Sequence, residues 1–427
     1  MDEEAFGRGL SHLFATVFLH CFATFMVAPA MIDVSMAAIC PGKDECSLAI
    51  YLTGAHQVII GLGSIVVMPL VGILSDSHGR KSMLTIPMAL SVLPLAILAY
   101  NRTKYYYYAY FALRTLIAMA TEGSVQFLAL AYVADNVSES KRAGVFGMMS
   151  GIASSSFVLG NFSSRFLSTA STFQVAAVMS VVALVYMRLF LPDSNPNPRD
   201  ESNTRLLSKN ATRNFKVLHL LQDSISLLRT SRTFAKAAAV AFFINVSENG
   251  FSSSAFYFLK AEFHFNKDQF ADLMMIVGVA GSFSQLVLLP ILTPIAGEKR
   301  MLSIGLFFTS LHMILYSVAW APWVAYASAS MSVLATFAAP CLRSVASKQM
   351  GSDEQGKGQG CITGISSLAN ILSPLAFTPL TALFLSDRAP FHFPGFTLLC
   401  AAVAAMIAFA QSTRLTSTSG GDQHLGV

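Results

Sequence analysis

Four polar residues recur at helical spacing inside the apolar segment 234–259. Asn245, Glu248, Asn249 and Ser252 are three or four positions apart, so they would share one face of a helix. An ionisable side chain is costly in an apolar segment long enough to cross a membrane, so by default it is a functional candidate. We predict that Glu248 binds a proton or a cation. The alternative is a structural carboxylate, hydrogen-bonded to a neighbouring helix.

A second set of ionisable residues lies in the first and fourth apolar segments. His20 belongs to a series of polar residues at steps of four, and it either binds protons or only forms a hydrogen bond. Glu122 and Gln126 share a helical face, and Arg114 lies about two turns away as a coupling residue or a structural ion-pair partner. The predicted proton-coupling residues are therefore Glu248, His20, Arg114 and Glu122.

Uncharged polar residues and one histidine inside the apolar segments are candidates for lining a substrate cavity. They are Asn245, Asn249, Gln57, His56, Gln126 and Gln285. For each of them, a packing contact with a neighbouring helix is the alternative.

These residues lie in a chain whose composition is that of an integral membrane protein. Of its 427 residues, 54% are hydrophobic and only 12% are charged, with a mean hydropathy of +0.57. Soluble domains carry about 25% charged residues, and a soluble chain with so few would expose large apolar patches. The composition therefore excludes a soluble enzyme, a disordered scaffold and a nucleic-acid-binding protein. The net charge of +5 is small.

Twelve apolar segments are long enough to cross a bilayer as helices of about 20 residues. They are 10–36, 50–74, 83–100, 106–133, 143–167, 172–191, 234–259, 270–292, 301–319, 322–346, 359–384 and 394–411. We expect an all-α membrane protein with two pseudo-symmetric six-helix bundles. The expected domains are an N-terminal bundle, a cytoplasmic central loop, a C-terminal bundle and a disordered cytoplasmic tail, over residues 1–192, 193–233, 234–411 and 412–427.

The distribution of Lys and Arg among the loops predicts the orientation of the chain. With the N-terminus inside, the inner segments hold 19 of these residues and the outer segments hold 7. Positive residues favour the cytoplasmic side, so both termini are predicted to be cytoplasmic. The sequence leaves open whether the membrane is the plasma membrane or an endomembrane (vacuolar or Golgi).

The two halves of the chain show a weak internal repeat. A shift of 213 residues places the segment 147–152 over 360–365, with two glycines four positions apart in each segment, and it aligns Ser154 with Ser367. Duplication of a six-helix unit is a common architecture of secondary transporters.

The loop between the second and third segments contains a specific motif. Gly72, Asp76, Gly79, Arg80 and Lys81 form a GxxxDxxGRK pattern in a short cytoplasmic turn. Gly79 allows the turn and the basic pair favours the inner face of the membrane. The pattern resembles the signature loop of the major facilitator superfamily.

Two further segments extend this resemblance along the whole chain. Residues 131–135, ending in Asp135 and followed by Arg142, resemble the junction of helices four and five in drug/proton antiporters of the tetracycline-efflux type. Segments 51–54, 101–103 and 265–272 are similar to plant proteins of the hippocampus-abundant-transcript group. The resemblance implies the major facilitator fold, transport of a small solute and a role for Arg114 in proton coupling.

The fifth segment departs from the antiporter signature. Asn161 follows Gly160 where the family has proline, and Ser164 and Arg165 stand where it has a pair of glycines. His20 occupies the position of an acidic residue in helix one. These changes weaken the case for antiport and leave the expected fold unchanged.

Cys40 and Cys46 both fall in the first outer loop, where they either form a disulfide or remain free thiols. No cluster of metal ligands is present in the sequence, so we expect no metal and no cofactor. The absence of a nucleotide-binding loop argues against transport driven directly by ATP. No nucleophile–base pairing is apparent across the segments, so we expect no enzymatic activity. The expected partners are a small-molecule substrate, protons and the lipid bilayer, with no nucleic acid, and the expected state is a monomer.

The leading hypothesis is a proton-coupled secondary transporter of a small organic solute that works by alternating access and resembles an antiporter. An uncoupled facilitator, a proton symporter of a small metabolite and a non-transporting receptor on the same fold are the alternatives.

Overall fold

The structure is a computed structural model that describes residues 3–43, 45–137, 139–192, 232–347 and 355–414. For some helical residues, among them Gly72, Asp76 and Arg142, it describes the backbone alone. Most of the predicted central loop and of the predicted tail lies outside the described residues.

All regular structure within these ranges is helical, and the helices fall into two groups along the chain. The first group is α1 (Glu3–Met26), α2 (Ala28–Ile39), α3 (Ser47–His78), α4 (Arg80–Tyr100), α5 (Lys104–Thr121), α6 (Ser124–Asn136), α7 (Glu139–Phe166) and α8 (Thr169–Phe190). The second group is α11 (Arg232–Phe263), α12 (Lys267–Phe283), the π-helix η1 (Ser284–Leu288), α13 (Leu289–Ala296), α14 (Glu298–Ser317), α15 (Pro322–Ser330), α16 (Ser332–Ala335), α17 (Ala338–Ser347), α18 (Gln355–Phe384) and α19 (Phe396–Thr413).

Ten helical segments are long and apolar enough to cross a membrane. They coincide with ten of the twelve predicted segments. The other two predicted segments are occupied by α11 and α14, which are 32 and 20 residues long. Polar residues such as Asn245, Glu248 and Asn249 lower the hydropathy of α11. This helix is therefore long enough to cross a membrane but less apolar than the ten other segments.

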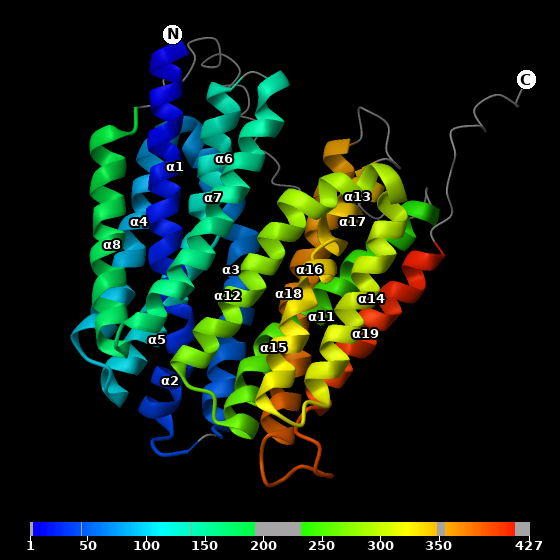
Figure 1. The fold of residues 1–427 in the computed structure, drawn as a ribbon. Coiled ribbons are helices and arrows are strands. Elements are labelled where there is room, and N and C mark those ends of the chain that lie inside the picture. The colour runs from blue at the N-terminus through cyan, green and yellow to red at the C-terminus, as the bar shows by residue number, and fades with distance from the viewer. Residues whose placement is uncertain (1–2, 44, 138, 193–231, 348–354, 415–427) are drawn as a thin grey trace, which may run out of the picture.

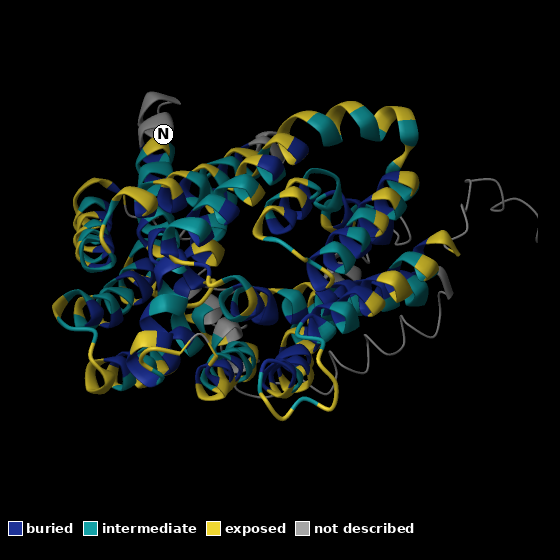
Figure 2. Ribbon diagram, turned by 60° about the horizontal axis from the view of Figure 1, so that its bottom comes forward, coloured by how far each residue is buried: buried dark blue, intermediate teal, exposed yellow. Residues whose placement is uncertain are grey.

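The two groups of helices lie side by side (Figure 1). They approach each other at the end of the molecule that is remote from the N-terminus, and they diverge toward the end where the N-terminus lies. Helix pairs α3/α18 and α7/α12 make contacts between the groups. Large apolar side chains such as Leu116 and Ile295 are exposed, and Figure 2 shows exposed residues on the outward faces of the helices, as lipid contact requires.

Glycines allow these helix pairs to approach closely. A Cβ atom at Gly54 of α3 would lie 2.1 Å from Oγ1 of Thr378 of α18, and one at Gly278 of α12 would lie 2.7 Å from a ring carbon of Phe157 of α7. Small residues at crossings are the usual device for close helix packing in membranes.

Several membrane-spanning segments are interrupted. The first is divided at Val27 between α1 and α2, the eighth contains η1, and the tenth is divided into α15, α16 and α17. The fourth is divided at Glu122–Gly123, where Gly123 adopts the left-handed conformation with φ 76°. The shift of 213 residues that aligns the repeat carries this break onto Ala335–Thr336, where α16 ends. The fourth and tenth segments are therefore interrupted at equivalent positions.

A second pair of matching positions, 218 residues apart, lies in two turns. Gly79 between α3 and α4 has φ 84° and ψ 144°, and Gly297 between α13 and α14 has φ 80° and ψ 147°. Each glycine carbonyl accepts a hydrogen bond from the amide four residues later, at Met83 and Met301. Only glycine adopts this conformation readily, and the matching geometry supports an internal repeat.

Candidate functional site

A cavity of about 160 Å³ lies inside the first group of helices, at the level where the first and fourth segments are interrupted. Its wall comes from α1, α4, α5 and α6 and from the two breaks, and prolines Pro87 and Pro94 of α4 border it. The polar residues of its wall include His20, Thr24, Ser91, Tyr110, Arg114 and Glu122. The cavity thus brings together three of the four predicted coupling residues.

Arg114 is held by a tyrosine one turn away. Its Nη1 donates a hydrogen bond to the hydroxyl group of Tyr110, and its guanidinium carbon lies 5.8 Å from the centre of the Tyr110 ring. The Tyr110 hydroxyl in turn donates to Sδ of Met31 at 3.4 Å. Arg114 and Glu122 attract each other electrostatically. In the part of the chain that the structure describes, neither of them forms an ion pair within 4.0 Å.

Histidines and an amide in the first two segments have different environments. Nδ1 of His20 is buried without a hydrogen-bond partner, while the His20 carbonyl accepts a hydrogen bond from Thr24 at 3.0 Å. Nδ1 of His56 lies 2.9 Å from Oγ1 of Thr115 on α5. Oε1 of Gln57 is buried and unpartnered. His56 and Gln57 do not belong to the wall of the cavity.

Glu248 lies outside this cavity, on α11 of the second group. Its side chain is exposed although it is near the middle of the helix. Nδ2 of Asn245 donates to Ser366 Oγ at 3.0 Å, and Nδ2 of Asn249 donates to Asn370 Oδ1 at 2.7 Å. Both amides therefore connect α11 to α18. Gln126 and Gln285 are exposed and lie apart from the cavity wall.

The signature loop is tied to the end of the fourth segment. Nε of Arg80 donates to Asp135 Oδ2 at 2.7 Å, and Nη1 of Arg80 donates to Ser75 Oγ. The two motifs identified separately in the sequence thus meet in one ion pair. Lys81 lies in the first turn of α4, and its carbonyl accepts a hydrogen bond from Thr85. The side chains of Asp76 and Arg142 are not among those described.

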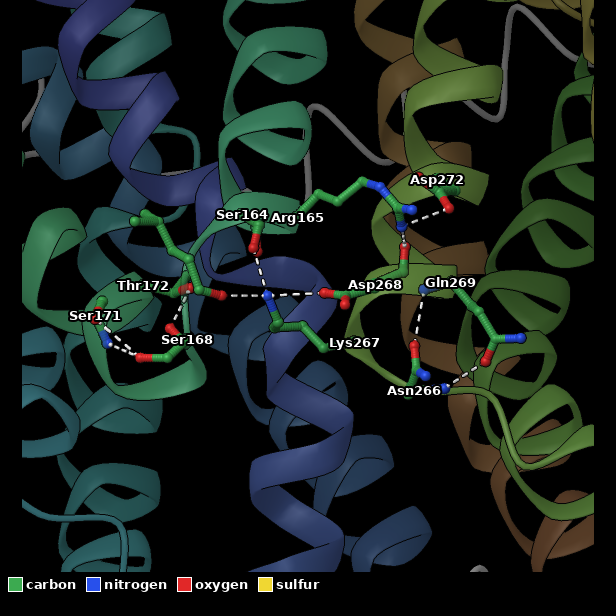
Figure 3. Close-up of polar contacts among 11 residues, drawn as sticks. Ser164, Arg165, Ser168, Ser171, Thr172, Asn266, Lys267, Asp268, Gln269 and Asp272 are labelled. Carbon is green, nitrogen blue, oxygen red and sulfur yellow. Dashed lines mark hydrogen bonds and ion pairs between the residues drawn. The ribbon is translucent and has the colours of Figure 1, made fainter.

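A polar cluster joins α7 to α12 across the two groups (Figure 3). Nη1 of Arg165 lies 2.7 Å from Oδ2 of Asp272. Nζ of Lys267 donates to the carbonyls of Ser164 and Leu167, each at 2.5 Å, and lies 3.0 Å from Oδ1 of Asp268. We call Arg165, Lys267 and Asp272 the outer latch. Two of its contacts use Ser164 and Arg165, the residues that replace the glycine pair of the antiporter signature.

Further polar contacts join the groups near the same end. Lys260 of α11 forms an ion pair with Asp33 of α2 at 2.8 Å. The hydroxyl of Tyr257 lies 2.5 Å from Thr53 Oγ1 and donates to the carbonyl of Ala49 at 3.1 Å. The segments that meet here are those predicted to lie at the outer face of the membrane.

Cys40 and Cys46 are joined by a disulfide in the structure. Their loop directly follows α2, the helix that carries Asp33. Among the described residues, no group of three or more His, Cys, Asp or Glu side chains could hold a metal ion.

The sequence reasoning missed Tyr110, Ser91 and the outer latch. Tyr110 belongs to an aromatic-rich stretch at the start of the fourth segment, and Lys267 lies between two predicted segments, so neither stands out in the sequence. A buried lysine can be recognised only after its neighbours are known: Lys267 is 8% exposed because α7 covers it.

Comparison with known proteins places this geometry in a family. The chain matches the Major Facilitator Superfamily over residues 13–374 and 237–424. It is 27% identical to the Hippocampus abundant transcript 1 protein of Mus musculus, covering 76% of this chain and 65% of the relative. It therefore spans just under two thirds of that relative's length. It is also 24% identical to the class C tetracycline resistance protein of Escherichia coli, covering 77% of this chain and 80% of the relative.

Solved structures share the fold at low sequence identity. The human organic anion transporter TETRAN superposes with a TM-score of 0.62 and 18% identity, covering 96% of this chain and 100% of that one. The nucleoside transporter NupG superposes with a TM-score of 0.68 and 14% identity, covering 95% of this chain and 98% of that one. The family match covers most of the sequence and agrees with the signature loop, the Arg80–Asp135 ion pair and the paired helix breaks. The chain belongs to the Major Facilitator Superfamily.

Proposed function

We propose that the protein is a secondary active transporter that moves a small organic solute by alternating access, coupled to protons in the manner of an antiporter. In this proposal α11 and α14 also cross the membrane, which gives twelve spans in two six-helix bundles with both termini cytoplasmic. Family membership and the transporter fold support a role in membrane transport. The coupling and the direction belong to the proposal.

The cavity at the break in the fourth segment is the observation that carries this proposal. It collects a histidine, an arginine and a carboxylate, His20, Arg114 and Glu122, inside a membrane-spanning helix group. Charged groups at such depth mark ion and substrate paths. Interrupted helices at corresponding positions of two repeats are the usual sign of a transporter binding site, and the fourth and tenth segments provide such a pair.

The arrangement of the two helix groups supports alternating access. The outer latch and the Lys260–Asp33 pair connect the groups at the predicted outer end, and the groups diverge at the opposite end (Figure 1). This is the arrangement expected of a conformation open to the cytoplasm. The resistance function named for the Escherichia coli relative supports export of a small organic solute as the direction.

The test is transport in proteoliposomes with an internal pH indicator, using a panel of labelled organic solutes that includes tetracycline. We expect solute movement with an opposed proton flux in the wild type. Glu122→Gln and Glu248→Gln each replace one candidate carboxylate by an amide of nearly the same shape. The proton flux should be lost in at least one of these variants. Glu262→Gln, at an exposed position of α11 outside the cavity, is the matched control.

Each other outcome has a definite meaning. Uptake without proton flux in the wild type would identify a facilitator and overturn the coupling. Proton flux that persists in both variants would remove these carboxylates from the coupling path. No uptake of any solute by correctly folded protein would favour the receptor alternative.

A further inference from the structure

The cavity in the first helix group carries one positive and one negative side chain that do not pair with each other. Arg114 and Glu122 both belong to its wall. They attract each other, yet neither is within 4.0 Å of an opposite charge among the residues described. Arg114 is partly buried and Glu122 is exposed, so a ligand can reach both side chains. A ligand that carries both charges would form a charge-assisted contact with each of them.

The two ends of the cavity differ in what they can bind. Arginine presents five N–H donors in a planar fork that matches a carboxylate or phosphate, and the recorded hydrogen bond of Arg114 uses one donor, toward Tyr110. Glu122 follows the last turn of α5, whose carbonyl groups lack helical partners and carry partial negative charge. The Glu122 end therefore favours a cation.

The charges also exclude simpler ligands. A purely anionic solute would meet the Glu122 carboxylate, and a purely cationic one would meet the Arg114 guanidinium, so each is penalised by one like charge. The volume of about 160 Å³ is smaller than the roughly 300 Å³ at which pockets for drug-sized ligands begin. The cavity thus suits a small solute that carries both charges.

We propose that this cavity binds a small zwitterion, with its anionic group at Arg114 and its ammonium group at Glu122. The inference rests on the proposed transport function and specifies the substrate class of the same site. Eight residues of helix separate the two positions by about 12 Å along the axis. The side chains of Arg114 and Glu122 shorten the distance between their charged groups by an amount that depends on their conformations. The preferred spacing of the ligand charges is therefore measured with ligands of different chain lengths.

The test is equilibrium binding to the purified full-length protein, using unbranched ω-amino acids from glycine to 6-aminohexanoate. Each member is compared with the carboxylic acid and the amine of the same chain length. We expect at least one amino acid to bind about tenfold or more tightly than both of its singly charged analogues, because each charge-assisted contact contributes roughly that factor.

Variants then assign the two ends. Arg114→Gln should reduce the affinity of the amino acid to that of the amine, and Glu122→Gln should reduce it to that of the acid. Arg114→Lys and Glu122→Asp keep the charges and should retain part of the preference, which guards against misfolding. Glu262→Gln and Arg388→Gln, both exposed and away from the cavity, should bind like the wild type.

The inference is overturned if no amino acid binds better than its analogues, or if both glutamine variants keep the preference. Its failure is distinguishable from failure of the proposed function. If transport with proton flux is observed for another solute class while no zwitterion binds, the transporter stands and this substrate class is wrong.

Discussion

At the scale of single residues, Lys267 is the centre of the outer latch. Its ammonium group donates to the carbonyls of Ser164 and Leu167, at the C-terminal end of α7. Carbonyl groups in the last turn of a helix lack partners within that helix and carry partial negative charge. The lysine of α12 therefore caps a helix of the other group, while Asp268 balances its charge. The free carbonyl groups at the end of α7 are thus used for a contact between the two halves of the chain.

We expect Lys267→Met to destabilise the protein by about 2 kcal/mol, because hydrogen bonds to charged groups contribute about that much and methionine keeps only the apolar stem. The measurement is the apparent Tm of the purified protein, which should fall. Lys43→Met, at an exposed loop position, is the control and should leave Tm unchanged. Equal Tm values for the two variants would show that the capping contact contributes no stability.

At the scale of elements, the break between α5 and α6 positions the candidate site. Gly123 has φ 76°, a conformation that costs residues with a Cβ about 1–2 kcal/mol. The helix α5 ends before Glu122, and both Glu122 and Gly123 belong to the cavity wall. In an unbroken helix, the backbone N–H and C=O groups at this position would bond to each other within the helix. No helix end would then lie beside the cavity.

We expect Gly123→Ala to lower stability by about 1 kcal/mol and to reduce transport, since the left-handed conformation is strained for alanine. Gly123→Asn should be milder, because asparagine tolerates this conformation. Gly147→Ala is the matched control: Gly147 is helical and a Cβ there meets nothing within 4 Å, so alanine should be neutral or stabilising. Tm and initial uptake rates are measured for all three variants. Unchanged transport in Gly123→Ala would show that transport does not depend on the conformation of Gly123.

At the scale of the whole molecule, the outer latch connects the two helix groups. The Arg165–Asp272 pair is partly exposed, with 41% and 28% of the side chains accessible. Pairs of this kind are worth about 0.2–1 kcal/mol. That energy is small for stability, yet it changes the ratio of two conformations by up to roughly fivefold. We therefore expect the Arg165–Asp272 pair to act on the conformational equilibrium more than on folding.

We expect Arg165→Asp to increase the fraction of molecules that are open at the outer end, because attraction to Asp272 becomes repulsion. The double variant Arg165→Asp with Asp272→Arg should restore the distribution. Spin labels at positions 104 and 388, both exposed and both predicted to lie on the outer side, report the distance between the two groups. If the single and double variants give identical distance distributions, the ion pair does not control this end.

Part of the cavity wall consists of residues that the sequence singled out. His20, Arg114 and Glu122 were recognisable because each is a charged or titratable residue in an apolar segment, and the cavity includes all three. Glu248 satisfied the same criterion and lies elsewhere. Asn245 and Asn249 have the packing contacts that were the alternative to cavity lining, although Glu248 between them is exposed. Polarity and spacing identify such residues but not their neighbours.

Family membership, membrane insertion and the approximate positions of most spanning segments were determined by the sequence alone, because they depend on local hydropathy and on motifs within a few residues. The tertiary structure decided which polar residues meet and where helices break. Arg165 and Asp272 are 107 positions apart, and the break at Gly123 lies in an apolar segment where glycine is common. Such features depend on how distant helices pack, and no local pattern encodes that packing.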